Sequence, residues 1–116
     1  MIILPRKLQK PGLIVLDNLL IRWFFNGTAN GASASFLLDS GASHCFIDET
    51  FAEQCGFARH PTDTSVQLAD GQQANIKLKC PLKLRLQRHI SETHCYVIDM
   101  QQQYDVILGV NWLEKH

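Results

Sequence analysis

An acidic side chain that directly follows a run of apolar residues is the clearest chemical feature of this 116-residue sequence. The segment reads Phe36-Leu37-Leu38-Asp39-Ser40-Gly41-Ala42. A carboxylate placed where a buried strand breaks into a tight loop is costly unless hydrogen bonds stabilise it. Asp39 is therefore a candidate catalytic group, although an Asp-Ser-Gly tripeptide by itself is also common in ordinary turns.

A second apolar run ends in glycine close to the end of the chain. Ile107 and Leu108 precede Gly109, and the residues after it, from Asn111 onwards, could begin a helix with Asn111 as its N-cap. The two apolar runs are far apart in the sequence, so any contact between them has to come from the fold.

Other arrangements of reactive residues are weaker. Ser43 and His44 stand close to Asp39, but adjacent residues of a strand point to opposite faces, which argues against a Ser-His-Asp triad. The five histidines are scattered, and the cysteines at positions 45, 55, 80 and 95 include no CxxC pair. We therefore predict no metal site and no cofactor, and free thiols in a reducing compartment.

Composition and charge limit the possible functions. The chain is 46% hydrophobic and 19% charged, which suits one small folded domain. Its 11 basic residues balance 11 acidic ones, and no basic run is present, so direct binding to nucleic acid or to anionic lipid is not expected. No apolar stretch approaches the length of a membrane span, and no secretory signal opens the chain. These features predict an intracellular, cytoplasmic protein without membrane contact.

The elements that must position Asp39 are mostly short strands. Residues 19–25 and the apolar residues near 36–38 predict a hairpin whose loop covers residues 26–31. Residues 48–55 have an acidic first turn and end before Gly56, which predicts a helix of about two turns. Further strands are expected near residues 76–80, 82–86, 94–98 and 106–108.

A hairpin with an Asp-Gly turn is the strongest local signal in the chain. Its predicted tip consists of Leu68, Ala69, Asp70, Gly71 and Gln72. Residues 1–13 read as a tail or linker, and residues 14–116 as one domain. Together these elements predict a mainly β fold, a small closed barrel with a hairpin flap and one or two short helices.

The sequence resembles the retropepsin family, the aspartic proteases of retroviruses and of gypsy-type LTR retrotransposons. The family pattern is apolar-apolar-Asp-(Thr or Ser)-Gly-Ala, then a glycine-containing flap hairpin, then apolar-apolar-Gly before a helix. Residues 37–42, the turn at 69–71 and residues 107–109 match this pattern in the same order. The Leu-Ala-Asp-Gly flap and the ending at residues 105–113 look most like the protease domain of gypsy-type polyproteins.

The resemblance implies an acid-protease barrel that acts as a homodimer on an extended peptide or a polyprotein. One chain carries one Asp-Ser-Gly, whereas this chemistry needs two carboxylates that share a proton, so the second Asp39 would come from a second copy. Ser40 would link the two loops across the axis, Gly41 would let substrate approach, and Ala42 would keep the loop small. Residues 68–72 would cover the substrate, and Ile107, Leu108 and Gly109 would support the loop.

A second interpretation stays open at this point. Genes domesticated from such elements, and the retropepsin-like domain of ubiquitin-shuttle proteins, resemble the same pattern. A domain of this kind can keep the fold and Asp39 while serving as a non-catalytic dimerisation or interaction module. Retropepsin dimers commonly use strands from the chain ends, and the given sequence stops directly after the last predicted helix.

Overall fold

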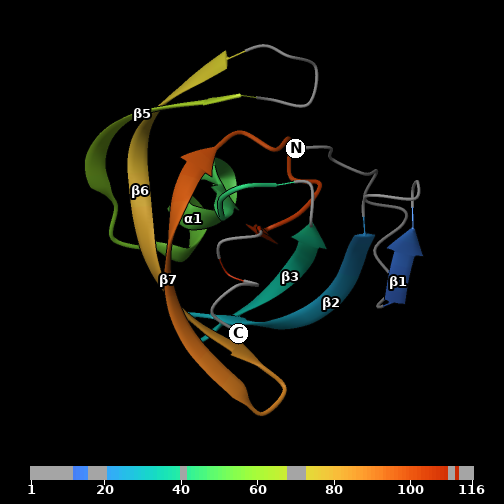
Figure 1. Cartoon of the computed structure of the whole chain (residues 1–116). Helices are drawn as coiled ribbons and strands as arrows, with labels where there is room; N and C mark the ends of the chain where they lie inside the picture. Colours follow the sequence, from blue (N-terminus) through green and yellow to red (C-terminus); the bar gives the residue numbers. More distant parts are fainter. Residues whose placement is uncertain (1–11, 16–20, 40–41, 68–72, 110–111, 113–116) are drawn as a thin grey trace.

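The computed structural model describes residues 12–15, 21–39, 42–67, 73–109 and 112. In this part of the chain eight strands form one sheet, which curves into a closed barrel with helix α1 packed beside it (Figure 1). The elements in chain order are β1 (Gly12–Val15), β2 (Ile21–Ala29), β3 (Ala32–Asp39), β4 (Phe46–Asp48), α1 (Glu49–Cys55), β5 (His60–Gln67), β6 (Gln73–Leu86), β7 (His89–Ile98) and β8 (Val106–Leu108). The mainly β class and the closed barrel are as the sequence predicts.

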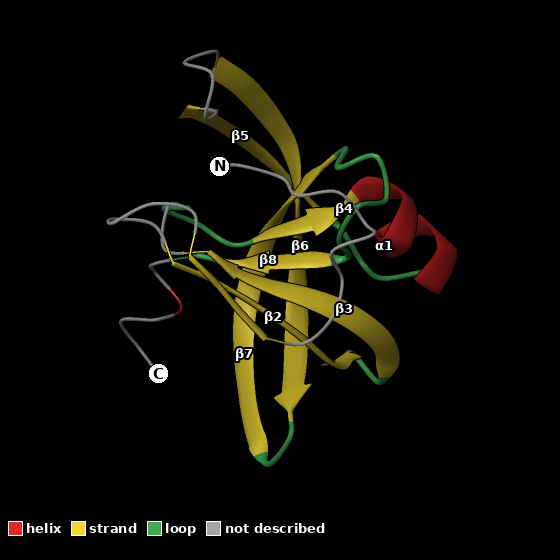
Figure 2. Ribbon diagram, turned by 90° about the vertical axis from the view of Figure 1, so that its right-hand side faces the viewer, coloured by secondary structure: helices red, strands yellow, loops and turns green. Residues whose placement is uncertain are grey.

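The strand order explains how distant parts of the sequence meet. The strands follow one another as β1-β2-β3-β8-β4-β7-β6-β5, and an additional pairing of β2 with β6 closes the ring. β8 lies between β3 and β4, parallel to the first and antiparallel to the second (Figure 2). The late apolar run at residues 106–108 therefore becomes the direct neighbour of the strand that ends in Asp39.

β3 and β8 are buried on both faces. Phe36 contacts one hydrophobic cluster and Leu37 the other, and in β8 the same alternation holds for Val106 and Ile107. Both strands therefore read as continuous apolar runs in the sequence, as expected for strands in the middle of a sheet. Their burial gives the chain a rigid platform at the point where β3 ends.

Helix α1 is short and well capped. Asp48 is its N-cap, and its side chain accepts a hydrogen bond from the Phe51 N–H at 3.2 Å. Gly56 ends the helix in the left-handed conformation at φ 68°. The helix predicted from residues 48–55 is thus present with the expected beginning and end. Of the second predicted helix, from Asn111 onwards, only Trp112 lies within the described residues.

The first hairpin turns later than predicted. β2 continues through residues 26–29, and the turn is confined to Asn30 and Gly31, which have φ angles of 49° and 84°. Asn26 and Gly27 indicated a loop, but here they pair with β3. Gly27 is needed for close packing instead, because a Cβ there would lie 2.5 Å from the Arg85 carbonyl oxygen of β6.

β6 is one long strand and not two. The sequence suggested a break at Pro81, yet the strand runs from Gln73 to Leu86. Pairing with β5 ends at Lys79, and pairing with β2 begins at Leu84. Neither β5 nor β2 pairs with Pro81 on that side of β6. Because proline has no N–H, it is tolerated at such an unpaired position, where no hydrogen bond between strands is lost. β7 is also longer than predicted and begins at His89.

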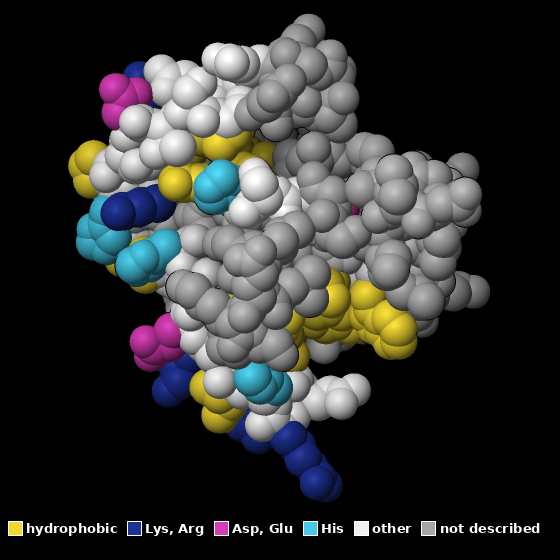
Figure 3. Space-filling model, in the orientation of Figure 1, with side chains coloured by type: hydrophobic (Ala, Val, Ile, Leu, Met, Phe, Trp, Pro, Cys, Tyr) yellow, Lys and Arg dark blue, Asp and Glu magenta, His cyan; other side chains and the backbone are white. Residues whose placement is uncertain are grey.

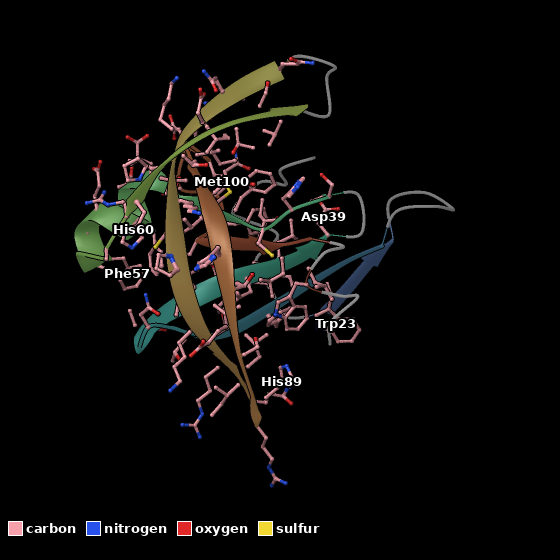
Figure 4. The ribbon with its side chains drawn as sticks, turned by 60° about the vertical axis from the view of Figure 1, so that its left-hand side comes forward. Trp23, Asp39, Phe57, His60, His89 and Met100 are labelled. Carbon is pink, nitrogen blue, oxygen red and sulfur yellow. The ribbon has the colours of Figure 1, made fainter. Side chains whose placement is uncertain are left out.

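The predicted hairpin with the Asp-Gly turn is formed by β5 and β6. The two strands pair from His60 opposite Lys79 to Gln67 opposite Gln73, with a bulge between Pro61 and Thr64. The predicted tip, residues 68–72, lies outside the described residues. Figure 4 shows the hairpin projecting above the end of β3.

Candidate active site

Asp39 occupies the last position of β3. Its side chain is fully buried in the chain (0% exposed), and its backbone lies opposite Arg22 of β2. The Ala42 N–H donates to the Asp39 carbonyl oxygen at 3.1 Å, so a tight turn follows the carboxylate directly. Ala42 is also buried, while Ser40 and Gly41 lie outside the described residues. The segment thus forms the strand-to-loop break that its sequence indicates.

Gly109 lies against the far side of this loop. A Cβ on Gly109 would lie 2.6 Å from the Ala42 carbonyl oxygen and closer still to that of His44. Such distances are below any that real Cβ atoms keep, so only glycine fits without movement of the loop. Ile107 and Leu108, which precede it, pair with Leu37 and Leu38. The structure therefore brings the two predicted motifs together, with the second packed against the first.

A polar clamp fixes the start of this strand pair. The Asp105 carboxylate accepts hydrogen bonds from the Ser35 N–H at 2.8 Å and from the Ser35 hydroxyl at 3.1 Å. The Asp105 N–H in turn is 3.2 Å from Ser35 Oγ, which accepts from it. These bonds set the register in which β8 lies beside β3. Sequence reasoning missed this pair, and the only signal was a carboxylate directly before the apolar run.

The polar residues after the loop contact each other. Ser43 Oγ and His44 Nδ1 are 2.8 Å apart, although the alternation argument placed them on opposite faces. They lie before β4 begins, in irregular backbone where strand alternation does not apply. The His44 ring lies 5.5 Å from that of Tyr96, centroid to centroid. Ser43 is exposed and His44 half-buried, whereas Asp39 is fully buried.

Three buried thiols pack beneath this region. Cys45, Cys80 and Cys95 are buried and form no disulfide bond with one another. The Cys45 carbonyl oxygen accepts from the Tyr96 N–H at 2.9 Å, which ties the loop to β7. Burial raises the pKa of the Cys95 thiol well above its ordinary value, and the hydrogen bond to Cys45 raises that pKa further. Burial also raises the pKa of the Cys80 thiol, so Cys80 and Cys95 are protonated packing groups.

The strands of the β5–β6 hairpin, close to the tip, share one hydrophobic cluster with the end of β3. Val66 of β5 and Ile76 of β6 pack in the same cluster as Leu37 and Ala42, which flank Asp39. The hairpin is thus anchored next to the carboxylate. The predicted tip of the hairpin, Leu68 to Gln72, lies outside the described residues.

Trp23 is the most exposed large aromatic side chain near the site. Its neighbour Phe24 is in the core, whereas Trp23 is 44% exposed. Trp23 lies opposite Leu38 in the β2–β3 pair, one step from Asp39 (Figure 4).

The part of the chain that the structure describes contains no group of three or more His, Cys, Asp or Glu side chains placed to hold a metal ion. No described helix is long and apolar enough to cross a membrane. What the site offers is one buried carboxylate on a rigid strand end, a small loop and an adjacent hairpin. With a second carboxylate from elsewhere, this arrangement suits general acid and base chemistry.

Comparison with known families gives a match over most of the chain. Residues 35–116 match a family described as the PEG10/RTL1 protease domain. No curated protein matches the chain significantly. The family match includes Asp39, the β5–β6 hairpin and Gly109.

Three solved structures of similar fold are titled as proteases or as a protease-like domain. An EIAV protease complexed with the inhibitor HBY-793 has 20% identity and a TM-score of 0.64, over 87% of this chain and 93% of that one. A retropepsin-like aspartic protease from Rickettsia conorii has 18% identity and a TM-score of 0.60, over 81% and 71%. The retroviral protease-like domain of Ddi1 from Leishmania major has 21% identity and a TM-score of 0.57, over 89% and 77%. The retropepsin-like fold predicted from the sequence is thus confirmed.

Proposed function

The chain belongs to the PEG10/RTL1 protease domain family, and from this premise we propose that it is an aspartic endopeptidase whose active site forms between two copies of the chain. The observation that carries the proposal is the position of Asp39, buried at the end of the central strand β3 within a retropepsin-like barrel. The chain contains a single Asp-Ser-Gly, so a pair of such carboxylates requires a second chain.

The proposed reaction uses the two Asp39 side chains in different protonation states. Two carboxylates at close range cannot both ionise, so the pair shares one proton. The ionised Asp39 takes a proton from water while the water oxygen forms a bond to the peptide carbonyl carbon. The protonated Asp39 gives its proton to the carbonyl oxygen. The intermediate then collapses: one of its two hydroxyls returns its proton to the ionised Asp39, the C–N bond breaks, and the amine leaves with the proton of the other Asp39, so that the pair again holds one proton.

The surroundings of Asp39 support this role. Gly109 and the Ser35–Asp105 clamp hold the loop and strand pair, which would keep the carboxylate in place without help from substrate. Trp23, exposed one position from Asp39 in the strand pairing, would pack against the second copy. Ser40, Gly41 and Ala42 would line the loop, and residues 68–72 would close over an extended peptide.

We take the substrate to be an extended segment of a polyprotein of gypsy-type retroelement origin. The Leu-Ala-Asp-Gly sequence at residues 68–71 and the ending at residues 105–113, which resemble those of gypsy-type polyprotein proteases, support this choice. The alternative function is a domesticated module that dimerises without cleaving. A peptide-cleavage experiment distinguishes the endopeptidase from the non-catalytic module.

The test is cleavage of a peptide library at high protein concentration between about pH 4 and 7, the range in which a carboxylate pair titrates. Wild type, Asp39→Asn and Asp99→Asn are compared, with pepstatin as inhibitor and sedimentation as the measure of mass. Asp99 is a matched control, because it is exposed on the loop after β7. In the Asp99→Asn variant, the side-chain amide oxygen can still accept the hydrogen bond from the Gln101 N–H. Wild type and Asp99→Asn should cleave, and Asp39→Asn should form the same dimer without cleaving.

A mixing experiment tests the shared site directly. If each active site needs Asp39 from both chains, an excess of Asp39→Asn chains should suppress wild-type activity by forming mixed dimers. Activity that is unchanged by the excess would contradict a two-chain site. A folded wild-type dimer that never cleaves any library peptide would instead support the non-catalytic module.

A further inference from the structure

The β6–β7 hairpin carries most of the lysines and arginines in the part of the chain that the structure describes. Alternate residues of the two strands point outward and lie opposite one another, in the pairs Lys79–Tyr96, Pro81–His94, Lys83–Glu92 and Arg85–Ile90. The residues between them, such as Cys80 and Leu82, point into the core. We call the outward residues 79, 81, 83 and 85 of β6 and 90, 92 and 94 of β7, together with Arg88 at the turn, the basic face.

Positive charge is concentrated on this hairpin although the chain as a whole is neutral. Residues 73–98 contain five basic residues and a single acidic one, Glu92. In the described part of the chain, ion pairs join Lys77 to Asp63 and Arg59 to Glu53. Lys83 and Arg85, by contrast, are exposed and pair with no described carboxylate. Figure 3 shows Lys and Arg side chains at the lower end of the molecule, where the hairpin turns.

A pocket opens on the same face. It has a volume of about 540 Å³ and lies between Asn30 of the β2–β3 turn, Pro81 and Lys83 of β6, and Glu92 and His94 of β7. Asn30 is a fixed wall, because its Oδ1 accepts from the Lys83 N–H at 2.7 Å and its Nδ2 donates to the Pro81 carbonyl oxygen at 3.2 Å. The pocket is therefore part of the folded barrel and does not depend on a loop.

Apolar surface lies beside the charges. Ile90, opposite Arg85, is 55% exposed, the highest value among the large hydrophobic side chains of the described residues. A partner that satisfies this face must offer both negative charge and an apolar side chain. A peptide chain does so, and its side chains recur every 6.6–6.8 Å on one side when extended, roughly the spacing of Lys83 and Arg85 on β6.

We propose that the basic face binds an extended acidic peptide segment of a partner protein, with its carboxylates on Lys83 and Arg85 and an apolar side chain on Ile90. Nucleic acid fits less well. Tyr96, the aromatic side chain next to this face on β7, is half-buried against His44 and Phe46 and is not open for base stacking. The face lies on β6 and β7, away from Asp39 on β3, so this binding does not depend on catalysis.

The test uses three fluorescein-labelled probes on the whole chain. The first is an extended peptide of about eight residues, Glu-Ser-Glu-Ser-Leu-Ser-Glu-Ser, in which the Glu and Leu side chains lie on one side and can face Lys83, Arg85 and Ile90 together. The second replaces each Glu with Gln, and the third is a single-stranded oligouridine of similar length. Anisotropy gives the affinities, and mass spectrometry verifies that each peptide stays intact. We expect the Glu-Leu probe to bind about tenfold tighter than the other two and to weaken as salt is added.

Two variants locate the binding. Lys83→Gln combined with Arg85→Gln should weaken the Glu-Leu probe by about tenfold, with an unchanged melting temperature, because both side chains are exposed and no new charge faces Glu92. Lys77→Gln is the control on the same strand, since Lys77 already pairs with Asp63 and lies beyond the pocket. Equal loss in the control, equal binding of the Gln-Leu probe, or tighter binding of the oligouridine would each overturn the proposal.

Discussion

Gly109 and Ala42 are so close that no side chain fits between them: a Cβ on Gly109 would lie 2.6 Å from the Ala42 carbonyl oxygen. Gly109 is buried directly after β8, and Ala42 is buried in the loop after Asp39. The position of the candidate catalytic loop thus depends on a residue at the other end of the domain.

Gly109→Ala should therefore displace the loop that carries Asp39. We expect a loss of about 1–3 kcal/mol in the free energy of unfolding, as for other overpacked buried sites, measured by urea denaturation. The rate of peptide cleavage should fall by more than the fraction of folded protein does, because the backbone of Ala42 and His44 has to move.

Gly56 provides the control for this prediction. Its φ angle of 68° is in the left-handed region that glycine favours, and a Cβ built there would have open space around it. Asn tolerates the left-handed conformation, so Gly56→Asn should cost little, whereas Gly109→Asn should be at least as damaging as Gly109→Ala. Similar losses for both Asn variants would contradict the packing explanation.

Asp48 links helix α1 to the segment after β7. It is fully buried, and while one oxygen caps the helix, its Oδ1 accepts from the Met100 N–H at 2.8 Å. Asp48→Ala removes the cap and leaves a buried N–H without a partner, which should cost about 2–4 kcal/mol of unfolding free energy. Asp48→Asn keeps one acceptor oxygen and should lose less. Equal losses for Ala and Asn would show that the Met100 bond contributes nothing.

The sequence predicted the parts of the site that have local signals. The apolar run into Asp39, the capped helix and the Asp-Gly hairpin each depend on neighbours within a few residues, and each is where the patterns placed it. Gly109 was predicted as part of a second motif, and the parallel pairing of β3 with β8 brings it to the loop.

What the sequence could not predict are the contacts between residues far apart along the chain. Asp48 and Met100 are 52 positions apart, and Ser35 and Asp105 are 70 apart, so neither pair leaves a periodic pattern. The extension of β2 through Gly27 also depends on β6, which approaches from a distant part of the chain. Turn chemistry at residues 26–31 was overridden by this tertiary pairing.

The Ser35–Asp105 clamp can be measured with a double-mutant cycle. Ser35→Ala, Asp105→Ala and the double variant should give a coupling free energy of about 0.5–1.5 kcal/mol, since a partly buried hydroxyl and a carboxylate are joined at 3.1 Å. Ser65 and Gln73 make a control pair, because their hydrogen bond is exposed and 3.4 Å long. Coupling as weak in the clamp as in the control pair would show that β8 is positioned by apolar packing alone.

Cys95 gives the stability of the barrel a dependence on alkaline pH. Burial holds the pKa of this thiol well above its ordinary value of 9.0, while the unfolded chain keeps the ordinary value. As the pH rises above 9.0, the unfolded state loses the proton and the folded state retains it. The folded state is then the more protonated one, so the free energy of unfolding falls with rising pH.

We expect this fall to approach about 1.4 kcal/mol per pH unit for a single thiol, measured by urea denaturation between neutral pH and about pH 11. Lysines and tyrosines also titrate in this range, so the quantity to compare is the slope of wild type against Cys95→Ala. The variant loses packing and should be less stable at every pH, but its stability should decline less steeply above pH 9.0. Parallel curves for the two proteins would mean that Cys95 ionises equally easily in the folded and the unfolded state.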